Sequence, residues 1–450
     1  MPDLGDRGWL LLMGIFALIL LATVIGQIWR YHWAEPAQRR QTIWFVIMVA
    51  SFVGWLLISL WDKLAVPSLI MQFIPLSLLP ISLVVAARRG AWGHPVSRRT
   101  IRLYAGSIAV VFVASLIAAA FWWSANKPVA INIADLSDGE PVPILVDTDM
   151  AMDDITALLY LLQHPATDLR AITVNGVAHA HCDSGVRNAL GLLELTNAPA
   201  IPVSCGRETA YPSGVPAPES WRRNADNLYG ASVRTGDRAR DPRPAAVLLR
   251  DTIREAPGEV TILAIGPLTN LAEAFEADPE LPGLVKSIVI MGGAVDVTGN
   301  VANGVEGISN QYAEWNFFAD PVAADIILAS GAPITLIPLD ATNDVPFSQS
   351  FHQRLSQHHE TKPATFVYNL FYLNSYWLDG GMYWWDTLTA AATLEDDLLT
   401  YDETSLDVVT ETGSETARTV RDPNGNPVRV AVSADAPRFE ALLLALLNRN

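Results

Sequence analysis

Cysteine and charge are both scarce in this chain of 450 residues. Its two cysteines, Cys182 and Cys205, are too few for a disulfide scaffold or a cysteine-rich zinc site. Only 17% of the residues are charged, against about 25% in soluble domains, and 50% are hydrophobic, with a mean hydropathy of +0.25. These values exclude a disordered chain and argue against a wholly soluble one. The length suggests two or three domains of roughly 150 residues each.

Positive charge is scarce everywhere except near the N-terminus. Residues 1–127 hold 11 Lys or Arg against 4 Asp or Glu, a net of +7, whereas residues 128–450 hold 19 against 43, a net of −24. An acidic surface repels phosphate, so we expect no nucleic acid to bind the larger part. The expected organisation is a membrane region over 1–127, a linker over 128–140 and a globular domain over 141–450.

Long apolar runs are confined to the first part. Four of them come close to the ~20 residues that a spanning helix needs, at 9–29, 42–61, 64–87 and 103–123. A cleaved signal peptide is the alternative for the first run, but that run is too long and three more follow it. Nine of the fourteen tryptophans lie in this part, several at the ends of runs, where indole rings prefer the membrane interface. We therefore predict an all-α transmembrane bundle within a lipid bilayer.

Arginine placement predicts how this bundle is oriented. The loops at 30–40 and 88–102 are rich in arginine, and loops of that kind face the cytoplasm. The N-terminus and the acidic domain are then both extracytoplasmic, on a multi-pass protein of the cell membrane. No charged residue inside the spans suggests an ion pathway, so the bundle is expected to be an anchor or an interaction module.

The acidic part alternates short apolar runs with helical periodicity. This alternation is typical of a mostly parallel central sheet with helices on both faces, an α/β fold that binds ligands at the carboxyl ends of its strands. The periodicity predicts strands at 144–146, 171–174, 260–265, 287–291 and 334–338. It predicts helices at 155–164, 185–196, 268–277, 321–330 and 438–448, and a hairpin within 408–432.

Four carboxylates follow the first expected strand within eight residues: Asp147, Asp149, Asp153 and Asp154. Like charges so close repel one another, and a bound cation or hydrogen bonds to a polyol would offset the repulsion. Carboxylate oxygens suit Mg²⁺ or Ca²⁺ rather than a soft metal. Two alternatives stay open here, namely a solvated acidic turn at a helix N-terminus and a phosphotransferase with an aspartyl nucleophile.

Further motifs follow this aspartate signature along the chain: Leu268-Thr269-Asn270, Met291-Gly292-Gly293, Glu314-Trp315-Asn316 and Trp385-Asp386. In this order they resemble the inosine–uridine-preferring nucleoside hydrolases. The resemblance runs from about residue 143 to the C-terminal helix and does not include the membrane region. It implies a Rossmann-like core and Ca²⁺-dependent cleavage of the N-glycosidic bond of ribonucleosides, for salvage of ribose or base.

The resemblance also implies roles for single residues. Asp149, Asp154 and Asp386 would bind Ca²⁺ together with the main-chain carbonyl of Thr269, and Asp149 would take a proton from the attacking water. Asp147 would support the cluster from behind. The remaining predicted site residues would contact the substrate, chiefly its ribose: Asp153, Met291, Asn310, Glu314, Asn316 and Trp385.

The sequence departs from the family pattern at three places. Ala151 replaces a glycine inside the aspartate signature, which is costly if that residue needs a positive φ. Trp385 stands where well-studied members have a histidine that protonates the leaving base, and indole cannot act as an acid at neutral pH. A Gly-Asn pair is missing from 175–181, where His179 and His181 become candidate leaving-group acids.

Three functional hypotheses follow. The first is a membrane-anchored, outward-facing nucleoside hydrolase. The second is a domain that binds a ribosyl ligand or Ca²⁺ without turnover, which the departures at Ala151 and Trp385 favour. The third keeps the chemistry but changes the substrate, for example to nicotinamide riboside. The base, a possible homo-oligomer, and whether Cys182 and Cys205 form a disulfide stay open.

Overall fold

The computed structural model describes residues 131–449, apart from positions 134–135, 137–139, 213, 304 and 306. These residues belong to one compact unit, Pro128–Asn450. The four expected membrane spans, at 9–29, 42–61, 64–87 and 103–123, lie outside the described residues, as does most of the expected linker. Among the helices of the described part, none has the length and apolar character needed to cross a bilayer.

A nine-stranded sheet forms the centre of the domain, in the order β3-β2-β1-β4-β5-β6-β9-β7-β8. The strands from β3 to β9 in this order are parallel, and β7 runs antiparallel to β9 and β8. The predicted mostly parallel sheet is therefore confirmed. The strands are β1 (Val142–Thr148), β2 (Thr167–Val174), β3 (Val203–Cys205), β4 (Thr261–Ala264), β5 (Ser287–Met291), β6 (Ile334–Ile337), β7 (Leu399–Val408), β8 (Thr419–Arg421) and β9 (Pro427–Ala434).

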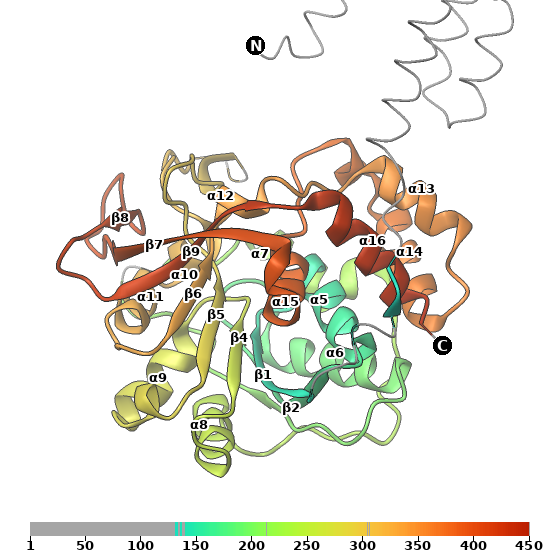
Figure 1. Cartoon of the computed structure of the whole chain (residues 1–450), viewed down its shortest axis with the longest axis horizontal. Coiled ribbons are helices and arrows are strands. Elements are labelled where there is room, and N and C mark those ends of the chain that lie inside the picture. The colour runs from blue at the N-terminus through green and yellow to red at the C-terminus, as the bar shows by residue number, and fades with distance from the viewer. Residues whose placement is uncertain are drawn as a thin grey trace, which may run out of the picture. The chain divides into compact units, whose positions relative to one another are not determined.

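Helices cover both faces of this sheet because its strands are apolar on both sides. In β1, Ile144 and Val146 belong to one core and Leu145 to the other, as the alternation of side chains along a strand requires. The first core is closed by α5 (Met152–Gln163), α15 (Trp385–Leu394) and α16 (Ala436–Leu447). The second is closed by α8 (Ala245–Glu255), α9 (Thr269–Ala277) and α11 (Pro321–Leu328), and Figure 1 shows the two groups on opposite sides of the sheet.

Some elements differ from the sequence prediction. The expected hairpin at 408–432 is instead part of the main sheet, because β7 begins at Leu399 and pairs with β9, which lies parallel to β6. Helix α6 (Cys182–Leu195) begins three residues earlier than expected. The further helices are α7 (Glu219–Asp226), α10 (Trp315–Ala319), α12 (Leu339–Thr342), α13 (Gln349–Gln357) and α14 (Lys362–Leu373), with 3₁₀ turns η2 (Leu228–Gly230), η3 (Leu281–Gly283), η4 (Val301–Asn303), η5 (Ser375–Asp379) and η6 (Asp396–Leu398).

The chain order places a crevice-forming point at the end of β1. From β1 the chain moves outward to β2 and β3, and then returns to the other side of β1 with β4. At such a switch point the loops that follow neighbouring strands diverge, and ligands bind at the carboxyl ends of the strands. The aspartate signature follows β1 directly and therefore lies at this point.

Cys182 and Cys205 form a disulfide whose Cα atoms are 5.6 Å apart, between the start of α6 and the end of β3. Closing a loop of about this length stabilises a protein by roughly 3 kcal/mol. We expect reducing agent to lower the melting temperature of the full-length chain by a few degrees. A Cys182→Ser, Cys205→Ser double variant should not respond to reductant, and an equal response of both proteins would contradict the bond.

Candidate metal centre and active site

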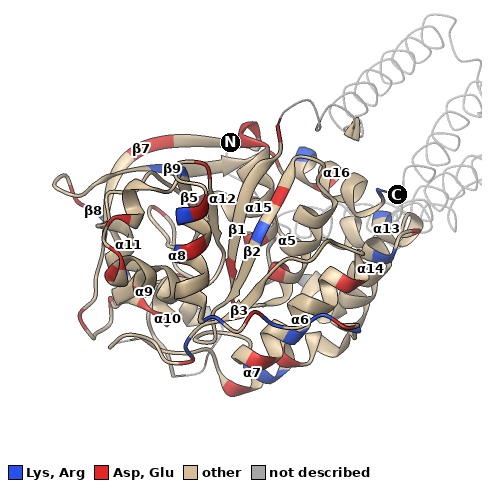
Figure 2. Ribbon diagram, turned by 90° about the horizontal axis from the view of Figure 1, so that it is seen from below, with Lys and Arg blue, Asp and Glu red and all other residues tan. Residues whose placement is uncertain are grey.

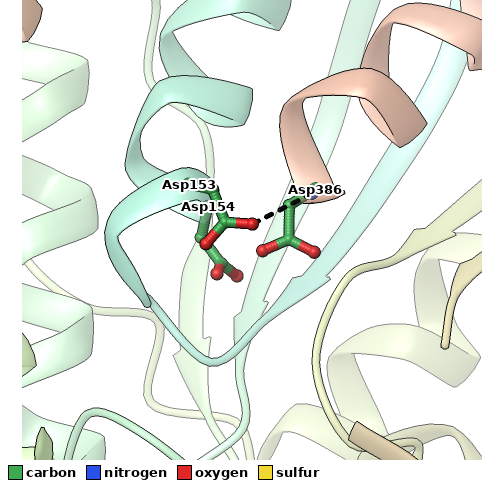
Figure 3. A group of neighbouring side chains, drawn as sticks. All are labelled: Asp153, Asp154 and Asp386. Atoms are coloured by element: carbon green, nitrogen blue, oxygen red, sulfur yellow. Dashed lines mark hydrogen bonds between the residues drawn. The ribbon is translucent and has the colours of Figure 1, made fainter. Parts of the chain in front are cut away.

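Three buried carboxylates meet between the first turns of two helices. Asp153 and Asp154 lie at the start of α5, and Asp386 lies at the start of α15, which packs against α5 (Figure 3). One oxygen from each lies within 4.8 Å of the others. The Asp386 backbone N–H donates to Asp153 Oδ2 at 3.1 Å, and the Thr387 hydroxyl donates to the Asp153 carbonyl at 3.0 Å. Residues more than 230 positions apart are thereby joined at one site.

A strained turn aims the aspartate signature into this site. Met150 is fully buried and has φ 61°, a left-handed conformation that is uncommon for a residue with a side chain. Ala151 has φ −65° rather than a positive φ, so alanine in place of the family's glycine carries no backbone cost there. Two hydrogen bonds to Asp154 Oδ1 fix its orientation. The Thr148 hydroxyl donates one, and the Asp149 N–H donates the other at 3.2 Å.

The cluster fits a hard cation. Asp154 Oδ2 and Asp386 Oδ1 are buried and have no hydrogen-bond partner among the described residues. Burial raises the pKa of Asp153, Asp154 and Asp386, and the charge of neighbouring aspartates raises the pKa of each further. Buried carboxylate oxygens that lack donors and repel one another are the ligand set that Mg²⁺ or Ca²⁺ satisfies. The geometry joins Asp153 to the predicted ligands Asp154 and Asp386.

Asp147 is buried at the end of β1, and its role in supporting the aspartate cluster stays a prediction. Its Oδ1 accepts hydrogen bonds from the Thr173 hydroxyl at 2.6 Å and the Asn270 amide at 2.7 Å. Burial nevertheless raises the pKa of Asp147 to about 7. The turn after β4 packs closely against the Asp149 backbone, because a Cβ at Gly266 would lie 2.9 Å from the Asp149 nitrogen. Only glycine permits this close approach.

Asp149 and His179 are in contact, which the sequence alone did not predict. Asp149 Oδ2 lies 2.9 Å from His179 Nδ1, and Asp149 Oδ1 accepts the Ala151 N–H at 3.2 Å. Burial alone would lower the pKa of His179, but the Asp149 carboxylate and the neighbouring aspartates raise it above its usual value. His179 is 17% exposed, so solvent or a ligand can reach it. Two of the three predicted catalytic residues, Asp149 and His179, are therefore adjacent.

The His181 ring contacts α7. Its Nδ1 lies 2.8 Å from Asp226 Oδ2, and Arg222 Nε donates to its Nε2 at 3.3 Å. Both ring nitrogens are occupied, so of the two candidate acids the geometry favours His179.

The Glu314 and Asn316 side chains contact the end of β5. Glu314 caps α10 and accepts the backbone N–H groups of Asn316, Phe317 and Gly293 at 2.8, 3.2 and 3.1 Å. Burial raises the pKa of Glu314 to about 7 despite these three donors. The Asn316 amide donates to the Met291 carbonyl at 3.2 Å. These residues lie beside the switch point, and their ribose contacts stay predictions.

Two further predicted residues, Asn310 and Thr269, bond to residues outside the carboxylate cluster, and a third, Trp385, precedes one of its members. Asn310 donates to the Thr416 carbonyl at 2.7 Å and accepts two N–H groups of its own loop, so it shapes that loop. The Thr269 hydroxyl donates to Asp320 at 2.7 Å, and the metal-binding role of its carbonyl stays a prediction. Trp385, directly before Asp386, is half-buried, and its buried indole N–H has no partner among the described residues.

Several site residues escaped the sequence analysis. Thr173 and Asn270 hold Asp147, and Trp221 and Arg222 on α7 contact the loop of the two histidines. The only sequence signal for Asn270 is its place in the motif Leu268-Thr269-Asn270. Arginine and tryptophan in a polar helix carry no pattern that indicates such contacts.

We predict that cation binding stabilises the full-length chain more at pH 8 than at pH 5.5. Burial raises the folded-state pKa values of these aspartates above their ordinary value of 3.8, so without a cation their contribution to stability falls as pH rises from 3.8 towards the raised values. A cation needs deprotonated ligands, so its contribution grows over the same interval. Melting temperatures in millimolar Ca²⁺ and in chelator test this at both pH values. Equal melting temperatures in Ca²⁺ and chelator at pH 8 would count against the site.

Comparison with known proteins agrees with this geometry. Residues 144–441 match the family model described as inosine-uridine preferring nucleoside hydrolase. Uridine nucleosidase 1 of Arabidopsis thaliana is 32% identical over 268 residues, which cover 58% of this chain and 77% of that protein. The pyrimidine-specific ribonucleoside hydrolase RihA of Escherichia coli O1:K1 is 34% identical over 211 residues, covering 45% of this chain and 61% of that one.

Solved structures show the same similarity. A plant nucleoside hydrolase superposes with a TM-score of 0.62 at 30% identity and covers 69% of this chain and all of its own. An inosine-uridine preferring nucleoside hydrolase from Bacillus anthracis gives a TM-score of 0.60 at 25% identity, with the same coverage. The family match at 144–441 includes all three residues of the carboxylate cluster.

Proposed function

Because this chain belongs to the inosine-uridine preferring nucleoside hydrolase family, we propose that it hydrolyses the N-glycosidic bond of ribonucleosides to ribose and free base. The observation that carries the proposal is the meeting of Asp153, Asp154 and Asp386 at the switch point of the sheet. Similar proteins are named for uridine or pyrimidine ribonucleosides, so uridine is the first substrate we propose.

We propose Ca²⁺ as the cation of this site. Asp153, Asp154 and Asp386 would hold it, with Asp149 and the Thr269 carbonyl as further predicted ligands. When bound, the cation would lower the pKa of a water molecule in the site. The Asp149 carboxylate then serves as the base that takes a proton from the attacking water, and His179, 2.9 Å from it, is the candidate acid for the leaving base.

A panel of substrates tests the proposal. Full-length protein is incubated with uridine, inosine, nicotinamide riboside and nitrophenyl riboside, with Ca²⁺ or with chelator, and free ribose is measured. We expect Ca²⁺-dependent ribose release from uridine. Ca²⁺ binding without ribose release from any substrate would favour a ligand-binding domain without turnover.

We also propose that four membrane spans anchor the enzyme with its catalytic domain outside the cell. The four apolar stretches and the arginine-rich loops at 30–40 and 88–102 support this topology. The disulfide between Cys182 and Cys205 supports it too, because such bonds persist mainly outside the cytoplasm.

This topology predicts that protease added to intact cells removes residues 128–450. The cut is expected in the segment that links the last predicted span to β1. Immunoblotting with an antibody to the C-terminal domain measures the loss, and a cytoplasmic marker protein controls for lysis. Complete protection until the cells are lysed would show that the domain faces inward.

A further inference from the structure

The loop from Asn175 to His181 carries both candidate acids between β2 and α6. Its inner side is tied to the aspartate turn. The Ala180 N–H donates to the Asp149 carbonyl at 2.9 Å, and the Asn175 N–H donates to the Thr148 carbonyl at 2.8 Å. These bonds fix the two ends of the loop and leave its middle, residues 176–178, to be held from elsewhere.

One arginine holds that middle section. Arg222 Nη1 donates to the carbonyls of Val177 and Ala178 at 2.7 and 2.8 Å, and Nη2 donates to the Gly176 carbonyl at 2.9 Å. Three successive carbonyls therefore converge on a single guanidinium. A planar fork with several fixed donors can satisfy three acceptors in this way, and the single ammonium of lysine cannot reproduce it.

The Arg222 side chain is committed to this loop. Arg222 is 6% exposed, and no carboxylate of the described residues lies within ion-pair distance of it. Burying a cation is costly unless its donors are satisfied, and here the carbonyl dipoles satisfy them.

His181 adds a second tie to the same helix. Because Arg222 Nε donates to His181 Nε2, the ring hydrogen of His181 lies on Nδ1 and is donated to Asp226 Oδ2 at 2.8 Å. Asp226 Oδ1 also accepts the His181 backbone N–H at 2.8 Å. His181 therefore holds the loop against α7.

Trp221 completes the contact between α7 and the loop. Its indole ring stacks on the His179 imidazole, with centroids 6.2 Å apart and planes 10° from parallel. Figure 2 shows α7 beside α6 at the edge of the domain, with residues of both charges along it. One short helix thus supplies a ring against His179 and a clamp behind it.

We propose that Arg222 is a positioning residue: by clamping the carbonyls of residues 176–178 it keeps His179 against Asp149. This inference rests on the proposed function for its kinetic readout. In Arg222→Gln we expect kcat for uridine to fall by about 10–100-fold. Residues that orient the ligands of a metal site contribute about that much to activity, and His179 contacts the predicted ligand Asp149. KM should change by less than about threefold, since Arg222 itself contacts no substrate. Arg222→Lys should keep the charge but not restore kcat fully.

The adjacent Arg223 provides a matched control. It lies on the same helix, is exposed and pairs only with Glu219 at 3.4 Å among the described residues. Arg223→Gln makes the same charge change and should keep wild-type kcat. Hydrogen–deuterium exchange of residues 176–180 in the full-length protein gives a readout independent of activity. We expect faster exchange of residues 176–180 in Arg222→Gln and Arg222→Lys, and exchange at the wild-type rate in Arg223→Gln.

The outcomes separate the two proposals. Wild-type protein that releases no ribose overturns the proposed function, and the exchange experiment still tests the clamp. Wild-type exchange of residues 176–180 in both Arg222 variants overturns the clamp. If Arg222→Gln fails to fold, the Arg222→Lys variant decides: wild-type kcat in folded Arg222→Lys overturns the inference, and reduced kcat with unchanged KM supports it.

Discussion

Asp386→Asn is expected to abolish ribose release from every ribonucleoside and to remove the stabilisation by Ca²⁺. Asp386 comes from α15 and is the member of the cluster that joins it to the start of α5. Losing an indirect partner of a metal site typically costs about 10–100-fold in activity or affinity, so losing a direct ligand should cost more.

The same variant should be at least as stable as the wild type in chelator. Substitution by asparagine removes one of three buried carboxylates whose pKa values are raised by burial and mutual repulsion. The measurements are ribose release and melting temperature, each with Ca²⁺ and with chelator. This pairing distinguishes a lost metal site from a misfolded protein.

Asp397→Asn is the control for charge. Asp397 follows α15 in η6, and its side chain is 69% exposed and pairs with Arg438 at 2.6 Å. It should keep both the activity and the response to Ca²⁺. A full Ca²⁺-induced rise in melting temperature in Asp386→Asn would show that the cation binds elsewhere.

His179→Ala is expected to slow inosine hydrolysis by about 10²–10⁴-fold and to spare nitrophenyl riboside. A purine needs a proton to leave, whereas nitrophenolate is a good leaving group without one. Trp385 cannot supply that proton, and His179 is the candidate acid whose ring contacts Asp149. The raised pKa of His179 keeps its ring protonated to higher pH than usual. Steady-state rates on both substrates measure the difference.

His181→Ala is the comparison for this prediction. Both of its ring nitrogens are occupied by Asp226 and Arg222, so we expect a smaller loss that is similar on the two substrates. Equal large losses in His179→Ala on both substrates would refute the acid role and would mean that His179 orients Asp149 instead. Asp149→Ala should inactivate the enzyme on every substrate.

Much of the fold follows from the sequence because many strands and helices have a recognisable local pattern of apolar and polar residues. The run at 287–291 is apolar after Ser287 and ends at Gly292-Gly293, and β5 has those bounds. The strand before the aspartate signature and the helix after it are likewise local patterns, and β1 and α5 confirm them. The order of strands and helices was therefore predictable, and so was the edge of the sheet at which ligands bind.

Other parts of the fold depend on pairing between distant segments. Strands β7 and β9 join the main sheet only because β9 pairs with β6, and no local pattern distinguishes this arrangement from a separate hairpin. The disulfide is of the same kind. Two cysteines 23 residues apart are compatible with free thiols or a bond, and the packing of α6 against β3 decides between them.

The candidate site divides along the same line. By itself the sequence determined which chemical groups gather after β1, since four carboxylates in one turn require a cation or a set of donors. Only the tertiary structure decided that Asp153 joins Asp154 and Asp386, that Glu314 is bonded to three backbone N–H groups, and that Arg222 clamps the histidine loop. The reason is physical: these contacts use backbone groups, or residues more than 40 positions apart, and neither leaves a periodic trace in the chain.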